Sequence, residues 1–310
     1  MALAVFCCDI HLKRLDIFYK IYYNYLVKLF FLCEVDEMQP KISLAGDLGS
    51  GKSTVSDILI KELGAEYYST GSIVRSIAEK RGMTVTELNV YMETHPEIDH
   101  EIDDGLVQLA NLDKFLIIDS RMAWHFTKGT FKVYMSTDIE TSALRIMNAN
   151  RQGEHASTLE ETIAQTRARR ESEKKRYKEQ YGVDIKDLSN YDLVIDTTIA
   201  TPREVADTII ACFEEWKRSK DFSCALISPE RLNYPDDEAD SELVESLATS
   251  LELGLGAPEV TVFERDGEFY LDSGYETALA HSFNMNRYIP ARLVPAYESA
   301  KKFVKMKNSL

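Results

Sequence analysis

The sequence has few basic residues for its number of acidic ones. Lys and Arg total 36 against 51 Asp and Glu, so the formal net charge is −15. Nucleic acids and anionic membranes attract positive surface, so we expect neither as a general partner. Cysteines are also few and scattered, without a CxxC pair. This indicates neither a disulfide framework nor a zinc site, and it favours reduced thiols in a cytoplasmic protein. The five are Cys7, Cys8, Cys33, Cys212 and Cys224.

The N-terminal segment lacks a long apolar run. Residues 17–33 are rich in Tyr, Phe and Leu but include Lys20, Asn24 and Lys28, and a membrane span needs about 20 mostly apolar residues. Charged residues before this run interrupt any signal-peptide core. We expect residues 1–38 to be an N-terminal extension without assigned function, either an amphipathic helix or a leader upstream of a start at Met38.

Length and composition are those of an ordinary globular protein. A chain of 310 residues with 45% hydrophobic and 28% charged residues predicts about two domains. We place the boundary where the composition changes after Trp216, giving domains 39–218 and 219–310.

A glycine-rich motif follows the first apolar run, residues 41–45. Its pattern, GxxxxGKS between a strand and a helix, is that of a P-loop. Backbone N–H groups of such a loop bind phosphate oxygens, Lys52 reaches the β- and γ-phosphates, and the Ser53 hydroxyl ligates Mg²⁺. We therefore expect ATP and Mg²⁺ as ligands. The nucleotide-binding residues are Gly46, Asp47, Leu48, Gly49, Ser50, Gly51, Lys52, Ser53 and Thr54.

Strands and helices alternate after the P-loop. Residues 67–75 read as strand, turn and helix, with Arg75 placed to bind a second phosphate. The apolar run 115–119 ends in Asp119, where P-loop proteins hold water around Mg²⁺. Further strands are expected at 131–136 and 192–196, and a closing helix at 202–216. The pattern predicts an α/β, three-layer P-loop sandwich with a parallel sheet.

A basic stretch separates the last two of these strands. Residues 167–178 hold seven basic side chains and two acidic ones. Arg169, Glu173 and Arg176 share one face of a helix because they are spaced i, i+4 and i+7. Two arginines on a mobile helix suit a lid over transferring phosphates. The alternative is a solvated basic helix.

Residues 41–216 resemble the cytidylate kinases, especially the short archaeal-type branch of the nucleoside monophosphate kinases. The resemblance rests on motifs at residues 46–54, 67–75, 95–99, 119–121, 171–177, 181–184 and 190–197. It implies transfer of the γ-phosphoryl group from ATP to CMP or dCMP, with Mg²⁺. By matching motifs it implies that Thr70, Arg75 and Arg121 bind the acceptor nucleotide, and that Arg169 and Arg176 are lid arginines that act with Lys52 in catalysis.

Three positions depart from the family pattern. Ser72 replaces the Asp of the usual Thr-Gly-Asp, and Ser120 replaces a glycine beside the acceptor. Met122 stands where bacterial relatives have an Asp that helps to read cytosine. We therefore expect kinase chemistry with modest nucleobase selectivity.

The C-terminal part has a different composition. Residues 221–259 hold ten acids and one base, which predicts a linker with a short helix at 241–251. An Asp-Gly hairpin at 260–271 and a helix at 274–283 follow. This order resembles the N-terminal domain of ParB-like partition proteins, but their phosphate motif falls at 274–277, which lacks arginine. The resemblance implies a degenerate ParB-like module that binds a protein partner or regulates the kinase; the alternative is an α+β appendage that only adds stability.

Two functions remain open at this point. One is a small-molecule kinase acting on a nucleoside monophosphate. The other is a P-loop ATPase or regulatory module whose working part is the ParB-like region. The Thr-Gly-x-x-x-Arg motif and the basic helix favour the kinase.

Overall fold

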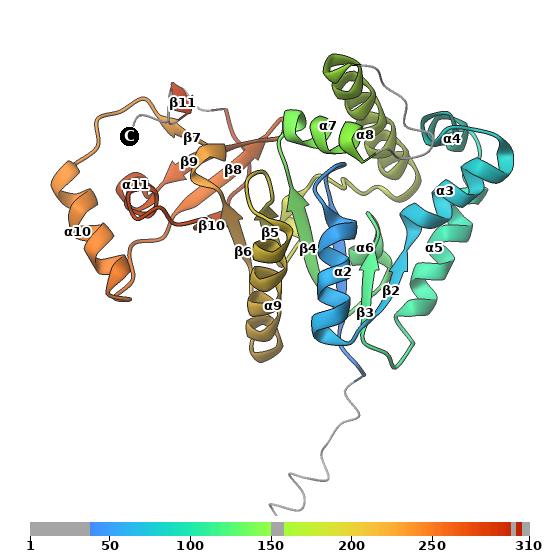
Figure 1. The fold of residues 1–310 in the computed structure, drawn as a ribbon, viewed down its shortest axis with the longest axis horizontal. Coiled ribbons are helices and arrows are strands. Elements are labelled where there is room, and N and C mark those ends of the chain that lie inside the picture. The colour runs from blue at the N-terminus through green and yellow to red at the C-terminus, as the bar shows by residue number, and fades with distance from the viewer. Residues whose placement is uncertain (1–37, 150–157, 299–301, 306–310) are drawn as a thin grey trace, which may run out of the picture. The chain divides into compact units, whose positions relative to one another are not determined.

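The computed structural model describes residues 38–149, 158–298 and 302–305, and the described residues from Pro40 onward belong to one compact unit (Figure 1). The expectations for the N-terminal extension fall outside these residues, except at Met38. Within the described ranges, no helix combines the length and apolar character that crossing a membrane requires.

The first half of the unit is built on a parallel sheet. Its strands pair in the order β5-β4-β1-β3-β2, and every pairing is parallel. The carboxyl ends of parallel strands meet at one edge, where ligands gather in such sheets. The strands are β1 (Lys41–Gly46), β2 (Glu66–Ser69), β3 (Leu116–Asp119), β4 (Thr130–Ser136) and β5 (Leu193–Asp196).

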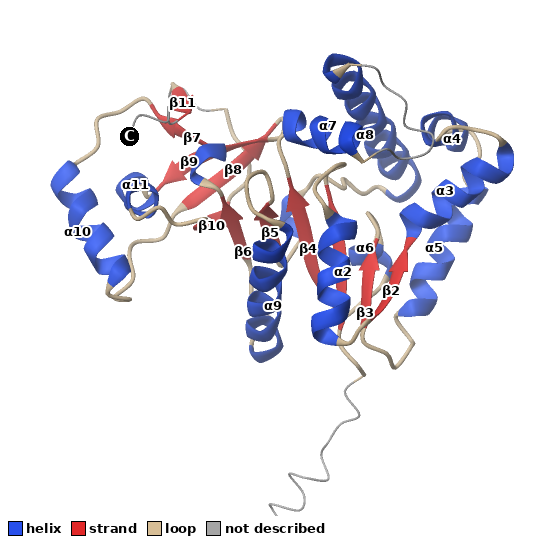
Figure 2. Cartoon of the chain, in the orientation of Figure 1, coloured by secondary structure: helices blue, strands red, loops and turns tan. Residues whose placement is uncertain are grey.

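Helices cover both faces of this sheet, as the three-layer prediction requires (Figure 2). Helices α2 (Lys52–Leu63) and α9 (Pro202–Arg218) pack on one face around Phe131 and Phe213. A capping box between Thr201 and Glu204 starts α9 where the sequence places a closing helix. On the opposite face, β3 packs with α5 (Glu97–Leu109), α6 (Ala123–Phe126) and α8 (Leu159–Tyr181). Helices α3 (Thr70–Arg81) and α4 (Val85–Met92) pack with α5, and α7 (Ile139–Asn148) packs against α8.

The sheet does not stop at β5. Strand β6 pairs with β5 in parallel. In the described part of the chain, the order outward from β5 is β6-β10-β8-β9-β7-β11. These strands are β6 (Cys224–Ile227), β7 (Leu232–Pro235), β8 (Thr261–Arg265), β9 (Glu268–Ser273), β10 (Ile289–Leu293) and β11 (Phe303–Lys305). The remaining elements are α10 (Ser241–Glu252), α11 (Tyr275–Phe283) and two 3₁₀ turns, Leu188–Asn190 and Pro229–Arg231.

The acidic stretch 221–259 is therefore not a plain linker. Strands β6 and β7 are almost wholly buried within it, because side chains of both join a core that includes Val194 of β5, namely Ala225, Ile227, Leu232 and Tyr234. Helix α10 and the hairpin of β8 and β9 form where the sequence places them, the hairpin turning at Asp266 and Gly267. The domain division at 218/219 stays a prediction, since both sides share one sheet and one core.

Candidate active site

The P-loop between β1 and α2 requires its glycines. Gly46, Gly49 and Gly51 all have positive φ angles. A Cβ atom at Gly46 would lie 2.3 Å from the Met135 carbonyl oxygen, and one at Gly49 would lie 2.5 Å from that of Ser142. Both spacings are below any real Cβ contact, so side chains at these positions would force the loop open.

Lys52 turns its ammonium group back into the loop. Its Nζ donates to the carbonyl oxygens of Gly46 at 3.0 Å and Asp47 at 2.9 Å. Burial lowers the pKa of Lys52 to about 8, and the nearby carboxylate of Asp119 opposes this shift. Gly51, which caps α2, offers no side-chain cap, so the first N–H groups of the helix can bind an anion. Ser53 and Thr54 are exposed at this end of the helix.

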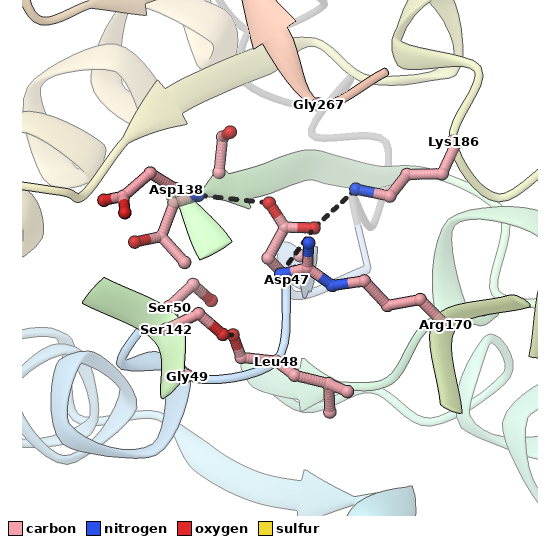
Figure 3. A network of polar contacts seen from close by, with 12 residues as sticks. Asp47, Leu48, Gly49, Ser50, Asp138, Ser142, Arg170, Lys186 and Gly267 are labelled. Carbon is pink, nitrogen blue, oxygen red and sulfur yellow. Dashed lines mark hydrogen bonds and ion pairs between the residues drawn. The ribbon is translucent and has the colours of Figure 1, made fainter. Parts of the chain in front are cut away.

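Asp47 lies at the centre of a polar network (Figure 3). Its Oδ1 accepts hydrogen bonds from Lys186 Nζ at 2.5 Å and from the Tyr134 hydroxyl at 2.9 Å, and its Oδ2 accepts from the Thr137 N–H at 3.1 Å. Arg170 Nη2 is 3.6 Å from Oδ1. Burial alone would raise the pKa of Asp47, but Lys186 and Arg170 outweigh burial and hold that pKa well below its usual range. The P-loop is thus tied to β4, to α8 and to the segment before β5.

Arginines from two elements meet at Glu173 on α8. Arg121, just after β3, forms an ion pair with one carboxylate oxygen of Glu173, and Arg169 Nε is 3.1 Å from the other. Glu173 is buried, and although burial raises its pKa, Arg121 and Arg169 lower it below the ordinary value. The spacing of Arg169 and Glu173 on one helical face therefore produces a direct contact.

Arg176 has different partners from Arg169. Its side chain is 4% exposed, and its Nε lies 2.7 Å from Oδ2 of Asp99 on α5. Its Nη1 also donates to the Asn89 carbonyl oxygen of α4 at 3.1 Å. In this structure Arg176 fixes α8 against α4 and α5.

The predicted acceptor residues lie at the ends of β2 and β3. Thr70 donates from Oγ1 to the Asp119 carbonyl oxygen at 3.5 Å, and the Asp119 carboxylate accepts from the Tyr67 hydroxyl at 3.1 Å. Arg75 is exposed on α3 and forms no ion pair with any residue that the structure describes. Arg75 is therefore available to a ligand, and Asp119 lies within electrostatic reach of Lys52.

Sequence reasoning missed three residues at this site. Arg170 lies in the predicted basic stretch but was not distinguished from its neighbours, and Lys186 belongs to no motif. Arg145 on α7 donates to the carbonyl oxygens of Thr197 at 2.7 Å and Gly49 at 3.4 Å, which links the P-loop to the loop after β5. These residues contact partners far away along the chain, which local patterns do not show.

A cavity of about 570 Å³ lies beside this network. Asp47 and Leu48 of the P-loop form one part of its lining, Arg167 and Arg170 of α8 another, and Asp266 and Gly267 of the β8–β9 turn a third. Arg121 and Glu173 also reach it, whereas Thr70 and Arg75 do not line it.

Among the described residues, no group of three His, Cys, Asp or Glu side chains is arranged to hold a metal ion. Mg²⁺ bound with a nucleotide takes most of its ligands from phosphates and water, so one hydroxyl and one carboxylate are enough protein ligands. Ser53 and Asp119 are of these two types and flank Lys52 on α2 and β3.

A family model, two relatives and one solved structure show what the chain is similar to. The model of the cytidylate kinase-like family matches residues 41–199. The cytidylate kinase of Thermoplasma volcanium is 37% identical over 195 residues, which cover 60% of this chain and 98% of that protein. The S-adenosylmethionine-dependent nucleotide dehydratase of Lacinutrix mariniflava is 39% identical over 179 residues, but this match spans only 37% of that protein's length and 57% of this chain. Shikimate kinase from Acinetobacter baumannii, solved with shikimate, has a TM-score of 0.40 and 20% identity over 58% of this chain and 96% of its own.

Proposed function

Since the chain belongs to the cytidylate kinase-like family and is a kinase phosphotransferase, we propose that it transfers the γ-phosphoryl group of ATP to a nucleoside monophosphate, with CMP or dCMP preferred. The observation that carries this proposal is the convergence on Lys52. Its charge interacts with Asp119, Arg121 and Glu173, which come from β3 and α8. The residues that we propose for phosphate binding, for the acceptor and for the lid thus lie within electrostatic reach of Lys52.

The residues present fit ATP and Mg²⁺. The P-loop N–H groups and the uncapped start of α2 would bind the β- and γ-phosphates, and Lys52 would exchange its contacts with the loop carbonyls for phosphate oxygens. A Mg²⁺ ion bound with the nucleotide would be held by Ser53 and, through water, by Asp119, and would neutralise charge on the phosphates. Arg121 and Arg169 would stabilise the charge of the moving phosphoryl group.

The acceptor site supports a preference with modest selectivity. Met122 is 1% exposed and packs with Leu106 and Ile118, so it offers the base no polar contact. The Ser72 hydroxyl donates to the Ser69 carbonyl oxygen at 2.7 Å. A site rejects an analogue strongly only when buried polar groups are left unpaired, and neither residue provides this penalty.

Comparing kcat/KM for CMP, dCMP, UMP and AMP at one Mg·ATP concentration tests the proposal. We expect CMP to be the best acceptor by about 10-fold over UMP, the effect of one contact of about 1.4 kcal/mol. A clear preference for AMP contradicts the cytidylate assignment. ATP turnover that no monophosphate increases would instead favour an ATPase or regulatory module.

For residues 219–310 we propose a ParB-like module that binds a protein partner. The hairpin, helix and strand of β8, β9, α11 and β10 support it by their order. Residues 274–277 at the start of α11 carry no arginine, so partner binding is a better proposal than phosphate chemistry. We also propose a cytoplasmic location, which the free thiols of Cys212 and Cys224 support.

A further inference from the structure

The turn between β8 and β9 forms one wall of the cavity beside the P-loop. Glu264, at the end of β8, and Asp266 both line this cavity. Glu264 is held in place because its carboxylate accepts a hydrogen bond from the Gly267 N–H at 2.5 Å. A carboxylate from the C-terminal region is therefore fixed beside the proposed nucleotide site.

Arg231 connects this turn to the kinase sheet. Its side chain is 4% exposed, and its Nη2 donates to the Gly267 carbonyl oxygen at 3.1 Å. Its Nε is 3.5 Å from Asp196, a fully buried residue at the end of β5. Its Nη1 is 3.6 Å from Glu268. The turn is thus linked to the same sheet edge as the P-loop through one arginine.

Lys186 lies between the two walls. Its ammonium group donates to Asp47 of the P-loop at 2.5 Å and to the Tyr134 hydroxyl at 2.7 Å, and it lines the cavity together with Glu264. Burial raises the pKa of Glu264; the positive charge of Lys186 opposes this rise, and the negative charge of Asp47 adds to it. Lys186 is thus paired directly with Asp47, and Glu264 lines the same cavity, from where its negative charge acts on that pair.

We propose that Lys186 is a positioning residue for the P-loop, and that Glu264 of the β8–β9 hairpin competes with Asp47 for its charge, so that the C-terminal region sets the nucleotide affinity of the kinase site. The inference rests on the proposed function, because it assumes that the P-loop binds ATP. The Asp47 carbonyl oxygen holds the Lys52 ammonium group at 2.9 Å. A change in how firmly Asp47 is held therefore reaches the group that contacts phosphate.

Each half of this competition has an expected effect on ATP binding. Lys186→Met removes the nearest cation from the buried Asp47 carboxylate, so we expect the Kd for Mg·ATP to rise about 10-fold, as for one lost charge contact. In Lys186→Arg the Kd should stay within about 3-fold of that of the unmodified protein, since arginine keeps the positive charge. Glu264→Gln removes the second carboxylate near Lys186, so Lys186 should hold Asp47 more firmly. We therefore expect the Kd for Mg·ATP to fall about 5-fold, which is within the range of interaction energies for residues of one polar network.

The decisive measurement is a double-mutant cycle on the full-length protein, with the Kd for Mg·ATP obtained by equilibrium dialysis. We expect Glu264→Gln to have no effect in the Lys186→Met background. An equal fold-change in both backgrounds would mean that Glu264 acts through its general negative field, and it would overturn the proposal. An unchanged Kd in Lys186→Met would overturn it as well. Glu245→Gln, an exposed carboxylate on α10, is the matched control and should change nothing.

Two further readouts keep the outcomes distinct. Thermal melting shows whether each variant is folded, and Lys186→Gln, which keeps a donor for Asp47, replaces Lys186→Met if that variant does not fold. Dialysis needs no acceptor, so a failure of the monophosphate assignment leaves the result unaffected. Absence of ATP binding by the unmodified protein would contradict the proposed function and this inference together, whereas normal binding with additive variants contradicts only the inference.

Discussion

Among the residues that the structure describes, the Lys52 ammonium group forms hydrogen bonds only with residues 46, 47 and 50 of its own loop, so it ties no distant elements together and is available to a ligand. We expect Lys52→Ala to leave the fold intact and to reduce phosphoryl transfer about 10³-fold, because a charge contact to the migrating group is lost. Lys61→Ala, an exposed lysine in the last turn of the same helix, is the control. Coupled ADP release and circular dichroism measure both effects. Near-normal turnover in Lys52→Ala would remove the P-loop from the mechanism.

Asp103 on α5 predicts a pH dependence of stability. It is 6% exposed and accepts a hydrogen bond from the Tyr181 hydroxyl at 2.6 Å. Burial raises its pKa to about 6, whereas an unfolded Asp titrates near about 3.9. Between these values the folded state binds more protons, so the stability contributed by this group falls as pH rises through 6.

Asp103→Asn removes this titration and keeps an acceptor for Tyr181. We expect the variant to melt at a higher temperature than the unmodified protein at pH 7–8, and the difference to shrink toward about pH 3, where Asp103 is protonated in both the folded and the unfolded state. Asp104→Asn, its exposed neighbour, should show no such trend. A melting-temperature difference that is constant between pH 4 and pH 8 would contradict the assignment.

At the scale of the element, α8 has two arginines with different duties. Removing Arg176 leaves Asp99 buried without its cation, so we expect Arg176→Ala to lower the free energy of unfolding by about 3 kcal/mol. After Arg169→Ala, Glu173 keeps Arg121, and the loss should stay below about 1 kcal/mol. Arg169→Ala should lower kcat more than it raises KM, because a contact to the moving phosphoryl group strengthens in the transition state. Arg176 is occupied by Asp99 and Asn89, so its loss should act mainly on stability. Urea unfolding and steady-state kinetics measure the two effects.

The outcome that contradicts this division is an equal loss of stability in the two variants. The double variant Arg176→Ala with Asp99→Ala is a matched control. It should recover part of the stability lost in Arg176→Ala, since no carboxylate is then left buried without its cation.

The elements differ in how far the sequence predicts them. Strands β1, β3 and β5 are mostly apolar because a parallel strand is covered on both faces, and such runs stand out in the sequence. The β8–β9 hairpin follows from Asp-Gly, since a two-residue turn needs positive φ at both positions. Strand β6 has only four residues and lies in an acidic stretch, and the acidic composition of that stretch predicted a linker instead of a strand.

Site residues likewise differ in how far the sequence predicts them. The P-loop is local, so its residues are found from one motif. The contact of Lys186 with Asp47 joins positions 139 residues apart, and no local spacing encodes it. The partner of Arg176 likewise depends on how α5 packs against α8. Such contacts follow only from the folded chain.

At the scale of the whole molecule, the two predicted domains share a core. Val194 of β5 and Tyr134 of β4 pack in one cluster with Ile227, Val262 and Ile289 from the C-terminal strands. We expect a protein cut after Arg218 to lose more than about 3 kcal/mol of unfolding free energy, the cost of exposing at least two large apolar side chains.

Urea unfolding of the shortened protein checks this prediction. A protein cut after residue 298, which lacks β11 but keeps β6, is the control and should lose much less, because two of the three residues of β11 are exposed. If the protein cut after Arg218 unfolds at the same urea concentration as the full chain, the shared core does not stabilise the kinase sheet.

The pairing of β6 with β5 also sets an order of events during synthesis. Strands β1 to β5 leave the ribosome before Cys224 does, and domains begin to fold as they emerge. Until then β5 is an open, apolar edge strand, the kind of surface on which nascent chains pair wrongly with one another. Only a few residues separate the end of α9 at Arg218 from Cys224, so the chain closes its own exposed edge soon after making it.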